Sequence, residues 1–233
     1  MMFCSIRDQS HLVGARHLQD EHFTGVLAAR VDLTIHQFTL TIFTMIENKY
    51  RQFYEAPLES IAKKIFISPN ALTITGFVIT LIASVTVANN LFWGGVLILV
   101  AGFFDMLDGA VARAHNKFSD FGAFLDSVLD RYSDSFIFLG FVAYFFNIRS
   151  ITGICLSLGT MIGALLISYT RARAEGLGRE CKVGIMERPE RVILLAIAAI
   201  TGWVEPIMGI LFMLTHVTVI QRMYHVWKVM KKD

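Results

Sequence analysis

Long apolar segments constrain the fold of this chain more than any other feature. Of its 233 residues, 55% are hydrophobic and only 17% are charged, and the mean hydropathy is +0.56. Short polar stretches divide the chain after residue 68 into six apolar runs, at about residues 69–88, 91–114, 119–146, 151–174, 191–203 and from 206 onward. An apolar run of about 20 residues is long enough to cross a bilayer as a helix. The sequence therefore predicts an all-α, polytopic membrane protein with six transmembrane helices.

The residues before the first run have a different character. Residues 1–44 are mixed and weakly patterned, and we treat them as an extension of unknown role. Residues 45–66 carry apolar side chains such as Leu58, Ile61 and Ile65 at helical spacing between charged ones. This pattern predicts an amphipathic helix in the membrane interface with its lysines toward the headgroups, although an ordinary soluble helix is an alternative. Residues 67–233 then form the transmembrane domain.

Basic residues are distributed unevenly over the predicted topology. Six spans place both termini on one side, where the loops and helix ends hold nearly all the Lys and Arg, whereas the opposite loops hold only Arg149. Cytoplasmic loops carry an excess of Lys and Arg, so we expect both termini to be cytoplasmic in a multi-pass protein of the cell membrane. The three cysteines form no C-x-x-C pair and suggest no disulfide framework or zinc site. We expect no nucleic-acid partner.

Four carboxylates interrupt this apolar pattern. Asp105 and Asp108 are three residues apart, and Asp126 and Asp130 are four apart. Either spacing places both side chains on one helix face, so two helices that meet along these faces bring all four together. Unpaired anions are costly in a nearly apolar site, and divalent cations such as Mg²⁺ or Mn²⁺ would compensate them, with enough ligands for two ions. Structural pairing of these acids with basic residues is the alternative.

Helix rise places the carboxylates near one face of the membrane. Residues 91–104 precede Asp105 in its run and span about 21 Å at about 1.5 Å per residue. In a hydrocarbon core about 30 Å thick, Asp105 therefore lies about 9 Å inside the cytoplasmic boundary. This depth suits an enzyme that joins a lipid-borne group to a water-soluble one. A divalent-cation carrier, the alternative of another class, would place such carboxylates near mid-depth in interrupted helices.

The segment around these acids resembles the signature of the CDP-alcohol phosphotransferases, which are integral membrane enzymes of phospholipid synthesis. The signature D-x2-D-G-x2-A-R-x8-G-x3-D-x3-D is matched without departure by Asp105, Asp108, Gly109, Ala112, Arg113, Gly122, Asp126 and Asp130. The resemblance implies that an alcohol attacks the phosphorus nearer the lipid in a CDP-linked lipid, and that CMP leaves. It also implies that the protein forms a homodimer.

The resemblance further implies a role for each position of the signature. Asp105, Asp108, Asp126 and Asp130 are implied to hold two ions of Mg²⁺ or Mn²⁺, and Asp130 is also implied to be the general base. The small residues are implied to leave room for cytidine, and Arg113 to contact phosphate. The implied site for the CDP-linked lipid thus consists of Asp108, Gly109, Ala112, Arg113 and Gly122.

Five arginines in the second half of the chain bear on the acceptor alcohol. They are Arg171, Arg173, Arg188, Arg191 and Arg222. A guanidinium matches phosphate geometry, and an arginine within an apolar helix usually faces a polar cavity. The segments SYTRARAEGLG, ERPER and QR resemble the phosphatidylinositol phosphate and archaetidylinositol phosphate synthase branch. In that branch the basic residues that match Arg171, Arg173, Arg191 (or Arg188) and Arg222 bind the phosphate of inositol 1-phosphate. That acceptor is therefore expected, with CDP-diacylglycerol or CDP-archaeol as donor. Glycerol 3-phosphate is the alternative acceptor, and the arginines could instead be topology charges.

Overall fold

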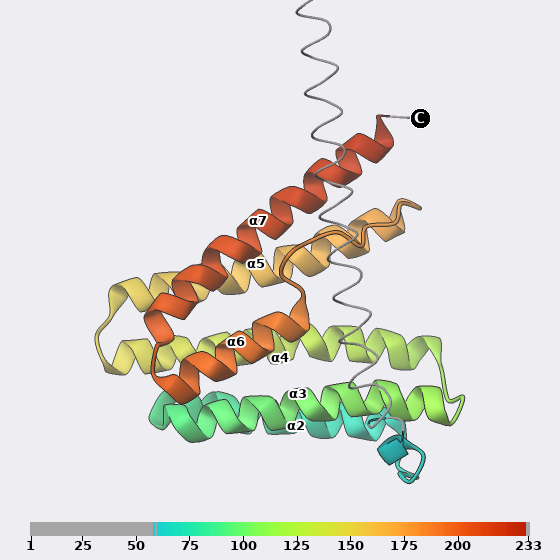
Figure 1. The fold of residues 1–233 in the computed structure, drawn as a ribbon, viewed down its shortest axis with the longest axis horizontal. Helices are drawn as coiled ribbons and strands as arrows, with labels where there is room; N and C mark the ends of the chain where they lie inside the picture. The colour runs from blue at the N-terminus through green and yellow to red at the C-terminus, as the bar shows by residue number, and fades with distance from the viewer. Residues whose placement is uncertain (1–57, 59, 232–233) are drawn as a thin grey trace, which may run out of the picture. The chain divides into compact units, whose positions relative to one another are not determined.

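The described part of the chain is helical throughout. The computed structural model describes Leu58 and residues 60–231. Within these residues there is no strand, and the long helices are α2 (Pro69–Asn89), α3 (Leu91–Ala114), α4 (Asp120–Asn147), α5 (Ile151–Gly176), α6 (Arg188–Thr201) and α7 (Val204–Met230) (Figure 1). The all-α prediction is confirmed, and the helices follow the six predicted runs closely.

Four of these helices, α2, α3, α5 and α7, are long and apolar enough to cross a membrane. Helix α4 has 28 residues, but its first half carries Asp126, Asp130 and Asp134. Helix α6 has only 14 residues, about 21 Å at about 1.5 Å per residue, which is shorter than the hydrocarbon core. The described chain therefore has four candidate spans and two further helices that differ from them in charge or length.

Local capping explains where the helices begin. A polar side chain accepts a hydrogen bond from a backbone N–H in the first turn of each of α2 to α5, and these capping residues are Ser68, Asn90, Ser119 and Ser150. At the start of α6, Glu190 accepts a 3.1 Å hydrogen bond from the backbone N–H of Glu187. This capping interaction starts α6 at Arg188, earlier than the predicted start at Arg191.

The helices pack as two groups, which are joined by contacts of α4 with α5 and by α6. Helix α2 packs against α3 and α4, α5 packs against α7, and contacts of α4 with α5 and of α6 with α3 and α7 join the groups. Figure 1 shows α2, α3 and α4 running along the long axis, with α5 and α7 on the other side of α6. Helix α6 begins part-way along the bundle, so its first turn lies beside the interior of α3 and α4 and not beside their ends (Figure 1).

The main core lies along the second half of α4. Phe138, Phe141 and Phe145 are at most 1% exposed and pack with apolar residues of α2, α3, α6 and α7. Helices α2 and α4 approach closely there, since position 140 is a glycine. A Cβ atom on Gly140 would lie only 2.4 Å from the carbonyl oxygen of Ser84. The acidic first half of α4 therefore extends from a firmly packed apolar half.

The predicted extension, residues 1–44, and most of the predicted amphipathic helix, residues 45–66, lie outside the described residues. Of the described part, Leu58 and residues 60–62 are helical. Leu58 and Ala62 are buried against Leu72, Leu107 and Val111 of α2 and α3. The interfacial helix stays a prediction, and this short stretch packs against the half of α3 that carries Asp105 and Asp108.

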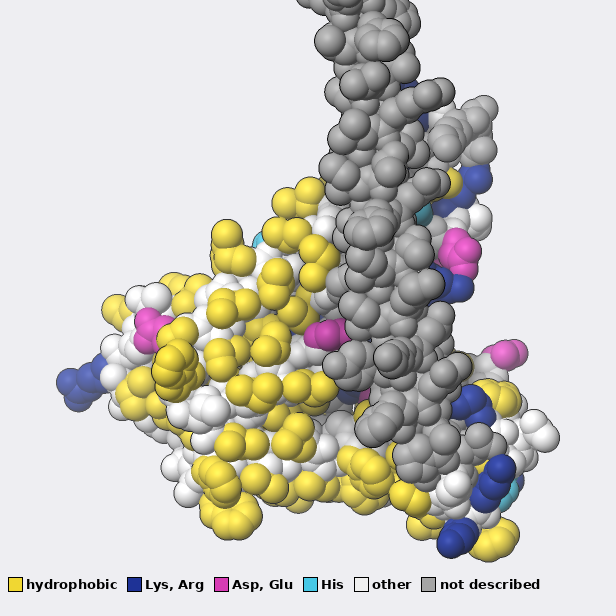
Figure 2. All heavy atoms as spheres, in the orientation of Figure 1, with side chains coloured by type: hydrophobic (Ala, Val, Ile, Leu, Met, Phe, Trp, Pro, Cys, Tyr) yellow, Lys and Arg dark blue, Asp and Glu magenta, His cyan; other side chains and the backbone are white. Residues whose placement is uncertain are grey.

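The surface is largely apolar along the helices. Figure 2 shows hydrophobic side chains over most of the visible face of the described chain, with most of the visible basic side chains toward the end that carries the α3–α4 turn. Large apolar residues are exposed on every long helix, including Val85 at 68%, Ile162 at 52% and Ile220 at 65%. Such a surface is typical of helices in contact with lipid.

Candidate active site

Three of the four signature carboxylates lie together. Asp105 and Asp108 project from α3 and Asp126 from α4, and each offers an oxygen within 4.8 Å of the others. Asp108 is buried at 5% exposure, whereas Asp105 and Asp126 are half-buried. The predicted meeting of two acidic helix faces is therefore present in the structure.

These three residues suit a divalent cation. Carboxylate oxygens are the hard ligands that Mg²⁺ and Mn²⁺ prefer, and three of them can close around one ion with little movement. Thr73 of α2 donates a 2.6 Å hydrogen bond to Oδ2 of Asp108. That bond fixes the orientation of the most buried carboxylate, as outer-shell partners do in metal sites. Asp105, Asp108 and Asp126 are therefore residues that could hold a divalent cation.

Asp130 lies beside this cluster and is paired with arginine. Its Oδ1 is 2.9 Å from Nη1 of Arg188, and its Oδ2 is 3.8 Å from Nη1 of Arg131. The same Nη1 of Arg188 donates a hydrogen bond to Oδ2 of Asp105. Arg188, at the first turn of α6, thus connects Asp130 to the carboxylate cluster.

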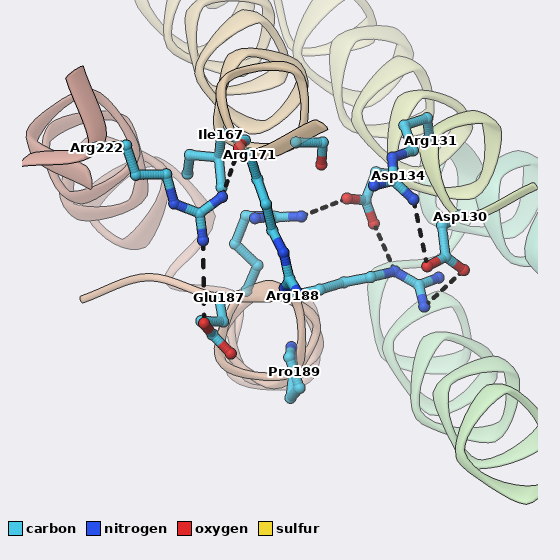
Figure 3. Close-up of a pocket in the computed structure, with 11 residues that line it drawn as sticks. Asp130, Arg131, Asp134, Ile167, Arg171, Glu187, Arg188, Pro189 and Arg222 are labelled. Atoms are coloured by element: carbon cyan, nitrogen blue, oxygen red, sulfur yellow. Dashed lines mark hydrogen bonds and ion pairs between the residues drawn. The ribbon is translucent and has the colours of Figure 1, made fainter. Parts of the chain in front are cut away.

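A cavity of about 180 Å³ opens next to Asp130 (Figure 3). Helices α4, α5, α6 and α7 and the segment before α6 contribute its lining, which consists of Asp130, Arg131, Asp134, Ile167, Ser168, Arg171, Glu187, Arg188, Pro189, Arg191 and Arg222. Four of the five arginines predicted to bind the acceptor phosphate line this cavity. The lining holds five arginines and three acids, and such a net basic wall with a carboxylate beside it is suited to a small anionic molecule with a reactive hydroxyl.

Arg173 is the predicted acceptor residue that the structure does not bring into the cavity. It is exposed near the end of α5, and it does not line the cavity that Arg171 lines. Two residues along an α-helix are rotated by about 200°, so Arg171 and Arg173 point in nearly opposite directions. The sequence pattern R-A-R gave no means of choosing between them.

The cavity arginines are held by different partners. Nε of Arg171 is 2.9 Å from Oε1 of Glu175 at the surface of α5. Arg222 is 3% exposed and donates hydrogen bonds to the carbonyl oxygens of Val183, at 2.8 Å, and Ile167, at 2.5 Å. These bonds connect α7 to α5 and to the segment before α6, as Figure 3 shows for Ile167. Arg222 therefore lines the cavity and also links α7 to the two neighbouring segments that form its walls.

The small residues of the signature lie on α3 and α4 beside the acids. Gly109 and Ala112 are half-buried on α3, and Arg113 is exposed on its last turn. A Cβ atom on Gly109 would lie 3.5 Å from Nη1 of Arg113, so this guanidinium lies near the open backbone of Gly109. A Cβ atom on Gly122 would lie 3.0 Å from Oδ1 of Asn70. Glycine leaves the backbone of residue 109 accessible, which a role in binding a flat group requires, whereas at residue 122 it allows Ser119 and Asn70 to approach closely.

Three residues of the site were not singled out from the sequence as site residues. Asp134 follows Asp130 by four residues, and this helical spacing was a usable signal. Arg131 adjoins Asp130 in the sequence, but nothing there distinguishes it from a topology charge. Thr73 is 35 residues from Asp108, and no local pattern connects the two.

Comparison with known proteins agrees with this geometry. Residues 66–221 match the family model described as CDP-alcohol phosphatidyltransferase. The archaetidylinositol phosphate synthase of Methanothermobacter thermautotrophicus is 39% identical over 79% of this chain and 95% of its own length. The protein of the same name from Pyrococcus horikoshii is 39% identical over 78% of this chain and 96% of its own length.

Solved structures show the same similarity. The phosphatidylinositol phosphate synthase of Mycobacterium tuberculosis with CDP-DAG bound has a TM-score of 0.67 and 30% identity, covering 75% of this chain and 94% of its own. The structure of that enzyme with manganese and citrate has a TM-score of 0.65 and 29% identity, covering 74% and 88%. The signature acids, the basic cavity and these similarities together show that this chain belongs to the CDP-alcohol phosphatidyltransferase family, as a membrane enzyme of phospholipid biosynthesis that transfers a phosphatidyl-type group from a CDP-linked lipid to an alcohol.

Proposed function

We propose that the acceptor alcohol is inositol 1-phosphate and that the donor is CDP-diacylglycerol or CDP-archaeol. The observation that carries this proposal is that Asp130 lines the same cavity as Arg171, Arg188, Arg191 and Arg222. A phosphorylated alcohol needs a base near its hydroxyl and cations around its phosphate. Relatives named archaetidylinositol phosphate synthase and phosphatidylinositol phosphate synthase support inositol 1-phosphate among such alcohols.

Asp130 acts as the general base in the proposed reaction. It takes the proton from the acceptor hydroxyl, whose oxygen forms a bond to the phosphorus nearer the lipid, and the bond from that phosphorus to the CMP oxygen breaks. Because an aspartate is a weak base for an alcohol, the acceptor must be held close and correctly oriented. The cavity arginines provide that orientation by binding the acceptor's phosphate.

Divalent cations complete the proposed site. Two ions of Mg²⁺ or Mn²⁺, held by Asp105, Asp108 and Asp126 with Asp130 as a further ligand, would neutralise the pyrophosphate and the charge that develops on departing CMP. The CDP-linked lipid lies along α3 and the start of α4 in this proposal. There Asp108, Gly109, Ala112 and Gly122 leave room for cytidine, and Arg113 contacts phosphate.

We also propose that α4 and α6 complete a six-helix transmembrane domain. Their contacts with α2, α3, α5 and α7 support this proposal, because neighbouring helices would shield the charges of α4 from lipid. The excess of basic residues at the end that carries the α3–α4 turn supports a cytoplasmic active site and cytoplasmic termini. The homodimer stays a prediction.

CMP release is the measurement that tests this function. The detergent-solubilised protein is assayed with Mg²⁺, a CDP-linked lipid and one acceptor at a time, and a chelator is added as the metal control. We expect release with inositol 1-phosphate and none after chelation. Release with glycerol 3-phosphate alone would keep the chemistry and overturn the acceptor, and full activity after chelation would overturn the metal sites. Family membership already favours this chemistry over the cation carrier.

A further inference from the structure

We propose that Asp134 is a positioning residue that holds Arg188 and Arg191 in the cavity and thereby sets the affinity for the acceptor's phosphate. Asp134 lies outside the family signature and is four residues after Asp130 on α4. The inference rests on the proposed function, because it assigns Asp134 a part in binding the phosphorylated acceptor. It concerns how the arginines are arranged and adds no new ligand to the acceptor.

Each carboxylate oxygen of Asp134 interacts with a different arginine. Oδ2 accepts a 2.5 Å hydrogen bond from Nη2 of Arg191, and Oδ1 is 3.5 Å from Nε of Arg188. Figure 3 shows Asp134 between Arg188 and a second arginine, with Asp130 one helical turn away. Because residues 130 and 134 share one face of α4, and 188 and 191 share one face of α6, two acids face two bases across these helices.

Arg191 depends on Asp134 for its charge balance. It is 2% exposed, and among the described residues its guanidinium is paired with Asp134. Its Nε and Nη1 are buried without a hydrogen-bond partner in the described chain, although Arg191 lines the cavity. A buried guanidinium needs a counter-ion, and its remaining N–H groups are available to an anion in the cavity. Asp134 therefore balances the charge of Arg191 and orients its guanidinium while leaving two of its nitrogens free to donate.

Asp134 also balances the attraction of the signature acids for Arg188. Nη1 of Arg188 contacts both Asp105 and Asp130, whereas its Nε faces Asp134. Without the Asp134 charge, the remaining carboxylate partners of Arg188 are those of the signature. The guanidinium would then be drawn toward the carboxylate cluster and away from the wall that Arg191 forms. Both effects of losing Asp134 lower the affinity of the cavity for phosphate.

The test is the effect of Asp134→Asn on the two substrates. The change keeps the size of the side chain and removes its charge. We expect the KM for inositol 1-phosphate to rise about tenfold, as for the loss of one charged hydrogen bond, while the KM for the CDP-linked lipid stays unchanged. Asp134→Glu, which keeps the charge, should recover part of the acceptor affinity. An unchanged acceptor KM in an active Asp134→Asn enzyme overturns the proposal, as does an equal rise in both KM values.

A double variant keeps the test valid if Asp134→Asn folds poorly. Arg191→Met with Asp134→Asn removes both buried partners, so no charge is left unpaired. If Asp134 acts through Arg191, the acceptor KM of the double variant should exceed that of Arg191→Met alone by much less than tenfold. A tenfold or larger difference between these two variants overturns that route.

A binding measurement separates this inference from the proposed function. Inositol 1-phosphate should raise the Tm of the wild-type protein in the absence of donor lipid, and Asp134→Asn should reduce that shift. Wild-type protein that releases no CMP with this acceptor refutes the proposed function. Wild-type activity combined with an undiminished Tm shift in Asp134→Asn refutes only the role of Asp134.

Discussion

Asp130 occupies the boundary between the carboxylate cluster and the basic cavity, and this position allows a direct test of its role. Asp130→Asn keeps the size of the side chain but cannot accept a proton at neutral pH. We expect CMP release to fall by about 100-fold or more, the usual contribution of a general base. Binding of the CDP-linked lipid, measured by isothermal titration calorimetry, should change much less, because Asp105, Asp108 and Asp126 remain.

Asp120 provides the matched control for this change. It lies on the same helix in its exposed first turn and belongs neither to the cluster nor to the cavity lining. Asp120→Asn should therefore keep wild-type CMP release. Full turnover by Asp130→Asn would remove Asp130 as the base.

Thr73 allows a test of metal binding through a residue that is not a ligand. Thr73→Val keeps the shape of the side chain and removes the 2.6 Å hydrogen bond to Asp108. We expect the Mg²⁺ concentration for half-maximal CMP release to rise about tenfold or more, as is common for outer-shell changes. Thr73→Ser, which retains a hydroxyl, is the control and should lie near the wild type. An unchanged Mg²⁺ requirement in Thr73→Val would show that Asp108 needs no such support.

The carboxylate cluster could be predicted from the sequence, because it depends on the spacing of residues within single helices. Asp105 and Asp108, and Asp126 and Asp130, each share a helix face because of their separation in the sequence, and the structure brings three of these carboxylates together. The contact of Thr73 with Asp108 depends on how α2 packs on α3, and that of Asp134 with Arg191 depends on how α4 packs on α6. No periodicity within one helix contains that information.

At the level of the elements, α5 shows how helix geometry separates two similar residues. Arg171 lines the cavity, whereas Arg173 is exposed and lies outside its lining. We expect Arg171→Ala to raise the KM for the phosphorylated acceptor about tenfold, as for the loss of one charged hydrogen bond. Arg173→Ala, a change of the same charge on the same helix, should leave that KM near the wild-type value. Steady-state kinetics with both substrates varied would measure this, and the opposite ranking would mean that α5 presents its other face to the acceptor.

The helix ends were largely predictable, because most of them are set by short-range interactions. Ser68 before Pro69, and Asn90 between two apolar runs, are local capping signals, and α2 and α3 begin directly after them. Helix α6 begins earlier than predicted, because the hydrogen bond between Glu190 and Glu187 extends it past Arg191. That shift matters for function, since it turns Arg188 from a loop residue into part of a helical face shared with Arg191.

At the level of the whole molecule, the shortness of α6 explains how a basic cavity can form inside an apolar bundle. If α6 were long enough to span the bundle, the additional turns before Arg188 would fill the space beside Asp130. Instead, α6 starts beside the interior of α3 and α4 (Figure 1), and the segment before it packs on α7 through the bond between Arg222 and Val183. The cavity is thus bounded by helix faces and by a single stretch of irregular backbone, which suits entry of a water-soluble substrate from one end.

The proposed topology makes a prediction that does not depend on activity. If α4 crosses the membrane, the α3–α4 turn and the α4–α5 turn lie on opposite sides, with the α3–α4 turn cytoplasmic. Lys117 and Ile148 are exposed in these turns, and each is replaced by cysteine in a variant whose Cys4, Cys155 and Cys181 are changed to serine. A membrane-impermeant maleimide should label Ile148→Cys on intact cells, but Lys117→Cys only after the membrane is permeabilised. Retained CMP release in both variants would show that the fold is intact. Labelling of both cysteines from the same side would mean that α4 does not cross, and labelling of Lys117→Cys alone on intact cells would invert the orientation.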